Sequence, residues 1–348
     1  MKKVLVIQTW GIGDMIMTTP MLHVLRTALP NAHVTVVAGS LAAGDVIRGS
    51  DLCDEVRSMS FRKRSVLDIL LFFSKVRLER FDAAIVATGL SPKVGLLLRL
   101  LSGLKLVAGG GIASRGWGYT HWRQTNLMNH RSLENIQILK LLLPDAETNG
   151  NLSAKFHLNQ AQETDAALVW REHELEGHVV MGLHPGCGVF EQDKKLPEPW
   201  CWDVISRFLT EFPNGKVALF FGPEDRLFEA GSKDMAKRVV RFQDMPLSVV
   251  AACIARTNVF LCGDTGLGHV AAAVGVPVVT VAGPTRINQT QPLGKRNLIV
   301  KTDYSLPCMP CFETPLFSKC PISQKCITTV SVQKAFDAIA QILEEVGT

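Results

Sequence analysis

The chain has 348 residues, of which 47% are hydrophobic and 20% are charged, and its formal net charge is +5. This length predicts two domains of ordinary size, and the composition excludes a disordered chain. The small positive charge is spread along the sequence, without the basic stretches interleaved with aromatic residues that nucleic-acid binders carry. We therefore expect no nucleic-acid partner; an anionic small ligand or a membrane surface fits the charge better.

The apolar runs of the chain are too short to cross a membrane. Residues 69–73 and 95–98 are the clearest of these runs, and a span needs roughly 20 residues. The N-terminus continues from Met1-Lys2-Lys3 into a short β-like run and lacks the small-residue cleavage site of a signal peptide. These features predict no membrane span and a cytoplasmic location.

Short β-branched runs alternate with longer helical patterns along the chain. In order, the first half gives a strand at 4–7, a helix at 15–29 and strands at 33–37 and 83–86. After a polar stretch around 146–165 the pattern starts again, with strands at 179–183, 217–221, 259–262 and 277–281. Such alternation predicts two doubly wound α/β domains with parallel sheets. Open sheets of this kind bind ligands beyond the carboxyl ends of their strands, so the space between the two domains is the expected site.

The first predicted strand runs directly into Gly11-Ile12-Gly13-Asp14, a turn that opens a helix. The two glycines begin a dinucleotide fingerprint, but Ile16 stands where its third glycine belongs. Asp14 would repel a phosphate at this helix N-terminus, whereas an ionised carboxylate there is suited to accept a proton from a bound group. An acidic cap of the first helical turn is the alternative, and spacing alone favours it.

A denser cluster follows the strand at 259–262, where the sequence reads Gly263-Asp264-Thr265-Gly266-Leu267-Gly268-His269. Its three glycines let backbone N–H groups approach an anion closely, and the helix that follows adds positive potential. Thr265 and His269 can add side-chain donors. This pattern favours a pyrophosphate site over the alternative, a tight turn with a capping Asp.

Two further turns carry polar residues to the same predicted sheet edge. His184-Pro185-Gly186-Cys187-Gly188 follows one strand, and Lys194 or Lys195, just beyond it, can neutralise a departing diphosphate. A solvated lysine pair is the alternative. Gly222-Pro223-Glu224-Asp225 ends another strand with carboxylates of the type that hold ribose hydroxyls. No Asp-x-Asp pair accompanies them, so the sequence does not demand a bridging Mg²⁺ ion.

These residues together resemble glycosyltransferase family 9, the ADP-heptose heptosyltransferases that build the lipopolysaccharide inner core. The resemblance spans nearly the whole chain. It rests on Gly13-Asp14 with Thr18-Thr19-Pro20, Lys194-x-x-Pro197, Gly222-x-Glu224, Asp264-Thr265-Gly266-x-x-His269, Gly275-x-Pro277 and Gly283-Pro284-Thr285.

The resemblance implies the GT-B architecture, in which two Rossmann-like domains face a cleft. Residues 1–165 would bind the acceptor, residues 175–330 would bind the donor nucleotide, and residues 331–348 would form a helix that packs back on the N-terminal domain. The reaction implied is inverting transfer of a heptose from an ADP-sugar to a hydroxyl of an acidic glycolipid, without a cofactor required for catalysis.

The resemblance also assigns site residues. Asp14 would be the general base and Lys194 would stabilise the departing ADP. The donor would be held by Gly13, Glu224, Met245, Asp264, Thr265, Gly266 and His269. Arg62, Lys63 and Arg64 would meet the phosphorylated acceptor. The amphipathic stretch Val66–Leu78 behind this basic run would place the protein peripherally on the anionic inner membrane surface.

Four of the nine cysteines, Cys308, Cys311, Cys320 and Cys326, cluster near the C-terminus among prolines. In a reducing compartment such a set resembles a four-thiolate site for structural zinc or iron, although the second pair is spaced more widely than usual. Four reduced thiols in a loop are the alternative. Similar loops occur in relatives that modify autotransporter proteins, so a protein acceptor is a second hypothesis.

Two hypotheses from other classes remain. A sugar-nucleotide epimerase on the same two-lobed architecture would need no acceptor site and would give the run at 62–64 no function. A catalytically idle sugar-nucleotide binder would not need both Asp14 and the cluster at 263–269.

Overall fold

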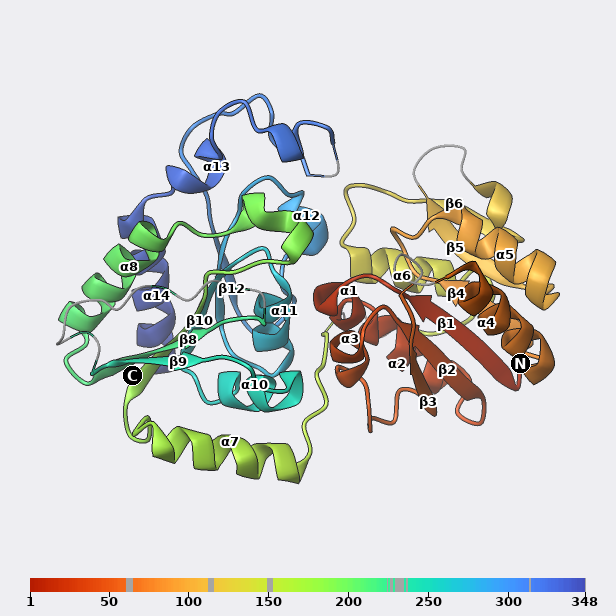
Figure 1. Ribbon diagram of the computed structural model, residues 1–348, viewed down its shortest axis with the longest axis horizontal. Coiled ribbons are helices and arrows are strands. Elements are labelled where there is room, and N and C mark those ends of the chain that lie inside the picture. The colour runs from red at the N-terminus through yellow and green to blue at the C-terminus, as the bar shows by residue number, and fades with distance from the viewer. Residues whose placement is uncertain are drawn as a thin grey trace. The chain divides into compact units, whose positions relative to one another are not determined.

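The computed structural model describes residues 1–60, 65–111, 116–148, 153–223, 225, 228, 235, 237–312 and 314–347, without the side chains of residues 189 and 190. The chain divides into two compact units, Met1–His157 and Leu158–Thr348. Both are α/β units in which helices surround a parallel sheet (Figure 1). Among the described residues, no helix has the length and apolar character needed to cross a bilayer.

The first unit has a six-stranded parallel sheet in the order β3-β2-β1-β4-β5-β6. Its strands are β1 (Lys3–Gln8), β2 (His33–Ala38), β3 (Glu55–Ser58), β4 (Ala83–Val86), β5 (Val107–Gly111) and β6 (His121–Gln124). Its helices are α1 (Ile12–Ile16), α2 (Thr19–Ala28), α3 (Leu41–Asp45), α4 (Val66–Glu79), α5 (Pro92–Ser102) and α6 (Arg131–Leu139), with a 3₁₀ turn, η1, at Gly116–Gly118. This is the Rossmann strand order, and its direction reverses between β1 and β4.

The central strands form because they are apolar on both faces, as strands covered by helices on both sides must be. Val4, Leu5, Val6 and Ile7 of β1 are all buried. Val6 pairs in register with Val36 of β2 on one side and with Ile85 of β4 on the other. The strands predicted at 4–7, 33–37 and 83–86 are therefore confirmed as β1, β2 and β4.

The second unit repeats the same topology, with the sheet order β12-β11-β10-β7-β8-β9. Its strands are β7 (Val179–His184), β8 (Gly215–Phe220), β9 (Val239–Phe242), β10 (Val259–Gly263), β11 (Val278–Val281) and β12 (Asn297–Val300). Its helices are α7 (Gln160–Glu172), α8 (Glu198–Glu211), α10 (Leu247–Ile254), α11 (Gly266–Ala273), α12 (Ile287–Thr290), α13 (Lys325–Thr328) and α14 (Val332–Val346), with 3₁₀ turns η2 (Val189–Lys194) and η3 (Phe317–Lys319). Here the direction of strand order reverses between β7 and β10.

The C-terminal helix α14 belongs to the core of this second unit. Ser331 caps the helix by accepting a hydrogen bond from Lys334 N. Ala335, Ile339 and Ile342 recur at helical spacing and are fully buried, and the helix packs against α8 and the strands β10, β11 and β12 (Figure 1). The amphipathic pattern predicts that this helix packs, but it does not identify the surface.

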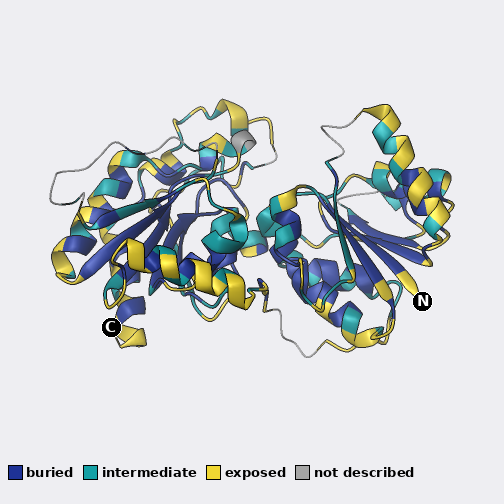
Figure 2. Ribbon diagram, turned by 60° about the horizontal axis from the view of Figure 1, so that its bottom comes forward, coloured by how far each residue is buried: buried dark blue, intermediate teal, exposed yellow. Residues whose placement is uncertain are grey.

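The polar stretch around residues 146–165 runs into a helix of the second unit, α7. Asn159 and Gln162 form a capping box that starts α7 immediately after the boundary between the units. The helix packs against α10, and Trp170 stacks on Phe242 at 6.2 Å between ring centroids. Figure 2 shows that exposed residues line one face of such outer helices while the strands inside are buried. The second unit thus begins near residue 158 rather than at 175.

Candidate functional site

Asp14 lies where the strand order of the first unit reverses, in the first turn of α1 directly beyond β1. Its carboxylate oxygen Oδ1 accepts a hydrogen bond from Nη1 of Arg131 at 2.8 Å, and both side chains are 20% exposed. Gly11 occupies the N-cap position, and no side chain caps this helix. Asp14 is therefore the acidic residue in the first turn of α1 and also one member of a half-buried ion pair, while the N-cap position itself belongs to Gly11.

The turn that carries Asp14 is fixed by a buried polar network. Thr18 Oγ1 donates to the backbone carbonyl of Asp14 at 2.7 Å and accepts from Gln8 Nε2 at 3.2 Å and from Asn135 Nδ2 at 3.3 Å. The side-chain carbonyl of Asn135 also accepts from the backbone N–H of Thr88 at 2.9 Å, just beyond β4. Satisfied buried networks of this kind rigidify the groups they join. The end of β1, the end of β4 and α6 are thus held together around Asp14.

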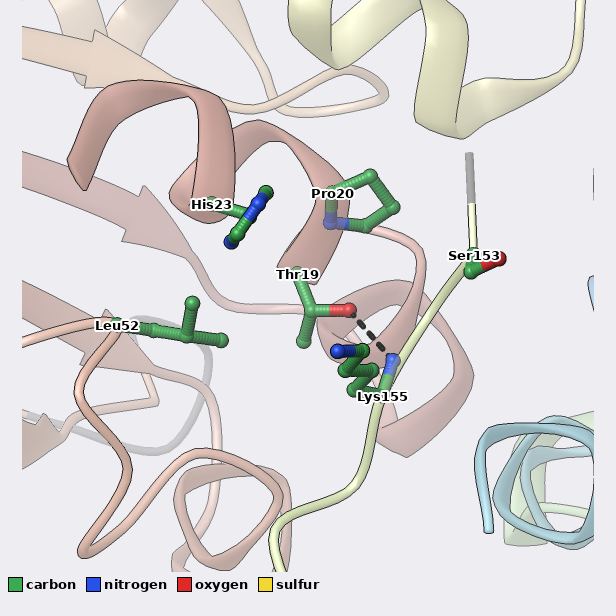
Figure 3. A pocket seen from close by; sticks show the side chains of 6 residues that line it. All are labelled: Thr19, Pro20, His23, Leu52, Ser153 and Lys155. Atoms are coloured by element: carbon green, nitrogen blue, oxygen red, sulfur yellow. Dashed lines mark hydrogen bonds between the residues drawn. The ribbon is translucent and has the colours of Figure 1, made fainter. Parts of the chain in front are cut away.

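A pocket of the first unit lies beside the N-terminus of α2 (Figure 3). It is lined by Thr19, Pro20, His23, Leu52, Ser153 and Lys155. Thr19 Oγ1 donates to Ile16 O at 2.8 Å and accepts from the backbone N–H of Lys155 at 3.1 Å, the contact dashed in Figure 3. The motif Thr18-Thr19-Pro20 therefore supports the Asp14 turn with its first threonine and anchors the chain before the unit boundary with its second.

In the second unit, the glycine-rich loop lies at the corresponding place beyond β10. Thr265 is the extended N-cap residue of α11. Its hydroxyl Oγ1 is buried and has no hydrogen-bond partner among the described residues. Asp264 Oδ2 accepts from Thr290 Oγ1 at 2.8 Å, and His269 is buried in the first part of the helix. The loop thus presents a helix N-terminus and a buried hydroxyl without a partner among the described residues, two kinds of donor that can bind an anion.

The structure brings Lys194 against this loop. A Cβ atom on Gly263 would lie 3.3 Å from the backbone carbonyl oxygen of Lys194, at the end of η2. The side chain of Lys194 is buried, and its Nζ lies 2.5 Å from Oε2 of Glu191 and 4.6 Å from the centroid of the Phe312 ring. Lys194 is therefore not a solvated surface lysine. Its neighbour Lys195 is half-buried.

The turn after β7 packs against the turn after β8. His184 Nδ1 lies 2.8 Å from the backbone carbonyl oxygen of Phe220 and donates to it, because that oxygen can only accept. Burial lowers the pKa of His184 below its usual value, which favours the neutral ring. Asp225 Oδ2 accepts from Gly222 N at 2.7 Å, and a Cβ on Gly186 would meet this carboxylate at 2.2 Å. Gly186 thus allows the two turns to touch.

Several predicted site residues have less structural context. Met245 is half-buried between β9 and α10, and Gly13 and Gly266 lie in the first turns of α1 and α11. Arg62, Lys63, Arg64 and Glu224 lie outside the described residues.

The four clustered cysteines lie near enough to one another for their charges to interact. Cys311 and Cys326 are buried and Cys308 and Cys320 are half-buried, and all four are free thiols. Burial, followed by the charges of the other three, raises the pKa of Cys326 to about 11. In the part of the chain that the structure describes, no three His, Cys, Asp or Glu side chains are grouped closely enough to hold a metal ion. The donor chemistry of four thiols fits zinc or iron.

Comparison with known proteins decides the family. The sequence profile of glycosyltransferase family 9 (heptosyltransferase) matches residues 69–320. The chain belongs to glycosyltransferase family 9. Among curated relatives, lipooligosaccharide heptosyltransferase 2 of Campylobacter jejuni is 23% identical over 175 residues, which are 48% of this chain and 52% of that protein. The chain thus spans about half the length of the curated relatives it matches.

Solved structures confirm the GT-B fold expected for this family 9 chain. A family 9 glycosyltransferase from Veillonella parvula superposes with a TM-score of 0.79 at 20% identity, covering 99% of this chain and 98% of that one. The ADP-heptose lipopolysaccharide heptosyltransferase II of E. coli gives a TM-score of 0.74 at 17% identity, with complete coverage of both chains. Similarity at this level of identity establishes the fold.

Proposed function

We propose that this family 9 chain is an inverting glycosyltransferase that moves a heptose from ADP-heptose to a hydroxyl of a lipopolysaccharide-core or related surface-glycan acceptor. The observation that carries the proposal is the loop beyond β10, where the buried Thr265 hydroxyl is unused and the Lys194 backbone packs on Gly263. The similarity of the chain to proteins named as heptosyltransferases supports heptose as the sugar transferred and ADP as the nucleotide of the donor.

In the proposed reaction, Asp14 accepts the proton of the acceptor hydroxyl while Arg131 orients its carboxylate. The acceptor oxygen forms a bond to the anomeric carbon as the bond from that carbon to the diphosphate breaks, and ADP leaves with the bonding electrons. A single displacement inverts the configuration. Lys194 stabilises the charge that develops on the diphosphate, so the protein supplies this cation itself. Thr265, Gly266 and His269 hold the diphosphate sugar, with Asp264, Gly13, Glu224 and Met245 completing the donor site.

The direct test is ADP release by the purified protein with a panel of nucleotide sugars and acceptors. We expect release with ADP-heptose and a phosphorylated glycolipid core, and persistence of that activity in EDTA. Asp14→Asn should lower kcat on the order of 10²–10⁴-fold with donor affinity nearly unchanged, because the base acts only on the acceptor hydroxyl. Near-normal turnover of Asp14→Asn would overturn the assignment of the base.

The same panel separates the other hypotheses. Transfer to an autotransporter protein but not to a glycolipid would identify the protein acceptor. Conversion of the sugar nucleotide without any acceptor would identify an epimerase. Binding of ADP-heptose without turnover would identify an idle binder.

We further propose that the protein rests peripherally on the anionic inner membrane surface through α4. Val66, Leu67, Leu70 and Leu71 of this helix are exposed, at 74%, 65%, 44% and 58%. Lys75 and Arg77 lie on the same helix, and cations beside an exposed apolar face favour binding to anionic lipids.

A structural zinc or iron at Cys308, Cys311, Cys320 and Cys326 is the remaining part of the proposal. The charges of Cys308, Cys311 and Cys320 raise the pKa of Cys326, so the four thiols lie near enough to influence one another, which supports the proposal. Elemental analysis of purified protein should give about one metal per chain, lost in a Cys308→Ser, Cys311→Ser variant. Fully active metal-free protein would rule out the metal.

A further inference from the structure

The cysteine loop, defined as residues 308–326, reaches the lysine proposed to stabilise the departing ADP. Its Phe312 ring lies under the Lys194 ammonium, with Nζ 4.6 Å from the ring centroid. The face of an aromatic ring attracts a cation, and the attraction is stronger when the pair is withdrawn from water. The Lys194 side chain is only 9% exposed. The ring is held in turn by Phe317, edge-on, with centroids 5.0 Å apart and planes at 86°.

The cysteine loop holds the segment of Lys194 at a second point. Gln324 Nε2 donates to Oδ1 of Asp193, the residue before Lys194, at 2.5 Å. The contact of Phe312 with Lys194 and that of Gln324 with Asp193 both join residues more than 100 positions apart in sequence; the separation of the second pair is 131. Together they fix the end of η2 from the side of the cysteine loop.

The first residues of the cysteine loop are also anchored to the turn that follows strand β11 of the same unit. The backbone N–H groups of Cys311 and Phe312 both donate to the carbonyl oxygen of Pro284, at 2.9 and 3.0 Å. Pro284 lies in the turn after β11, next to Thr285, whose buried hydroxyl has no partner among the described residues. In Figure 1 the loop belongs to the blue segment around α13. Phe312 is therefore positioned by the carboxyl edge of the sheet on which the donor loop also lies.

A lysine is a flexible point charge on a four-carbon stem, so its usefulness at a developing charge depends on where it is held. The Nζ of Lys194 has Glu191 on one side, at 2.5 Å, and the Phe312 ring at 4.6 Å. An incoming diphosphate competes with the Glu191 carboxylate for the ammonium, because both are anions. The uncharged ring does not compete, and it continues to attract the ammonium while the diphosphate is bound.

We propose that Phe312 is a positioning residue for Lys194, whose aromatic face keeps the ammonium in place as the bond to the diphosphate breaks. This inference rests on the proposed function of Lys194 as the cation that stabilises ADP. It makes the cysteine loop a part of the donor site.

The test compares Phe312→Leu, which keeps an apolar side chain but removes the aromatic face, with Phe312→Tyr, which keeps the face. In heptosyl transfer from ADP-heptose, Phe312→Leu should lower kcat about three- to thirtyfold while the donor KM changes less than about threefold. Phe312→Tyr should retain most of the kcat. The control is Phe336→Leu, since Phe336 lies under Arg207 at 4.7 Å elsewhere in the unit and should leave kcat unchanged.

Two results would overturn the proposal. One is a Phe312→Leu enzyme with wild-type kcat, or with a loss matched by Phe312→Tyr. The other is a further loss when Phe312→Leu is added to Lys194→Met, because a residue that acts only through Lys194 has no effect without it.

A readout without turnover keeps this test separate from the proposed function. The NMR signal of the Lys194 Cε methylene should be shifted by the aromatic ring in the wild type and in Phe312→Tyr, and not in Phe312→Leu. A protein with this shift but no transferase activity would contradict the proposed function alone. The same shift in all three proteins would contradict the placement of the ring.

Discussion

At the scale of residues, Asp14 and Arg131 form a half-buried ion pair whose proposed role concerns chemistry more than stability. Both side chains are one-fifth exposed and joined at 2.8 Å. Exposed pairs contribute only about 0–1 kcal/mol to folding, because solvent screens them and ordering the side chains costs entropy; this half-buried pair should contribute toward the upper end of that range. The stronger anchor of this turn is the buried network around Thr18 and Asn135. We therefore expect the guanidinium to act mainly on the direction of the carboxylate.

We expect Arg131→Gln to lower kcat roughly tenfold, since misorientation of a base by a small distance is costly. Its free energy of unfolding should fall by no more than about 1 kcal/mol. ADP-release kinetics and urea unfolding measure the two quantities. Arg131→Lys, which keeps the charge but not the planar donor, is the matched variant, and its kcat should lie between those of the wild type and Arg131→Gln. A wild-type kcat for Arg131→Gln would contradict the orienting role.

At the scale of elements, the strands and the two polar loops follow from local sequence, because parallel strands covered on both faces are apolar runs ended by turn residues. The residues that complete the site do not. Arg131 meets Asp14 across 117 positions of sequence, at the start of a helix that carries no motif. Phe312 and Gln324 contact the segment of Lys194 from a loop singled out only for its thiols. Periodicity and spacing carry local information, whereas these contacts depend on how elements pack.

Helix α11 and strand β10 touch so closely that their contact depends on a glycine of the helix, Gly268. A Cβ on Gly268 would lie 2.6 Å from the Sγ of Cys262, a fully buried side chain. Gly268→Ala should therefore destabilise the protein by about 1–3 kcal/mol through overpacking, as denaturant unfolding would measure. Adding Cys262→Ala removes the clashing sulfur and should restore part of this loss. An additive double variant would show that the two residues do not meet as described.

The exposed leucines of α4 give the membrane proposal a direct test. The full chain should bind anionic phosphatidylglycerol vesicles in a sedimentation assay, and Leu67→Glu with Leu71→Glu should weaken that binding about tenfold or more. Leu168→Glu is the matched control, because Leu168 is also 50% exposed but lies on α7. High salt should weaken the wild-type interaction, since screening reduces the attraction to anionic lipid. Equal losses in the control would point to nonspecific adsorption.

At the scale of the whole molecule, the chain repeats one topology twice, and each unit encloses its own apolar core. Phe73 and Leu98 belong to the core of the first unit, whereas Phe208 and Ile339 belong to that of the second. Units with separate cores need not unfold together. The proposed donor contacts beyond β10 and the contacts of Lys194 all lie in the second unit. Binding of ADP should therefore stabilise the second core selectively.

Hydrogen exchange monitored by mass spectrometry can measure this selectivity. With ADP at a hundredfold excess over its Kd, a ligand that binds only the folded unit stabilises it by about 2.7 kcal/mol. Amides of β7 and β10, which exchange when the second unit unfolds, should then exchange about a hundredfold more slowly. Amides of β1 and β4 in the first unit should keep their rates. Equal protection of both sheets would mean that the two units unfold as one, and protection of β1 and β4 alone would place the nucleotide in the wrong half of the proposed enzyme.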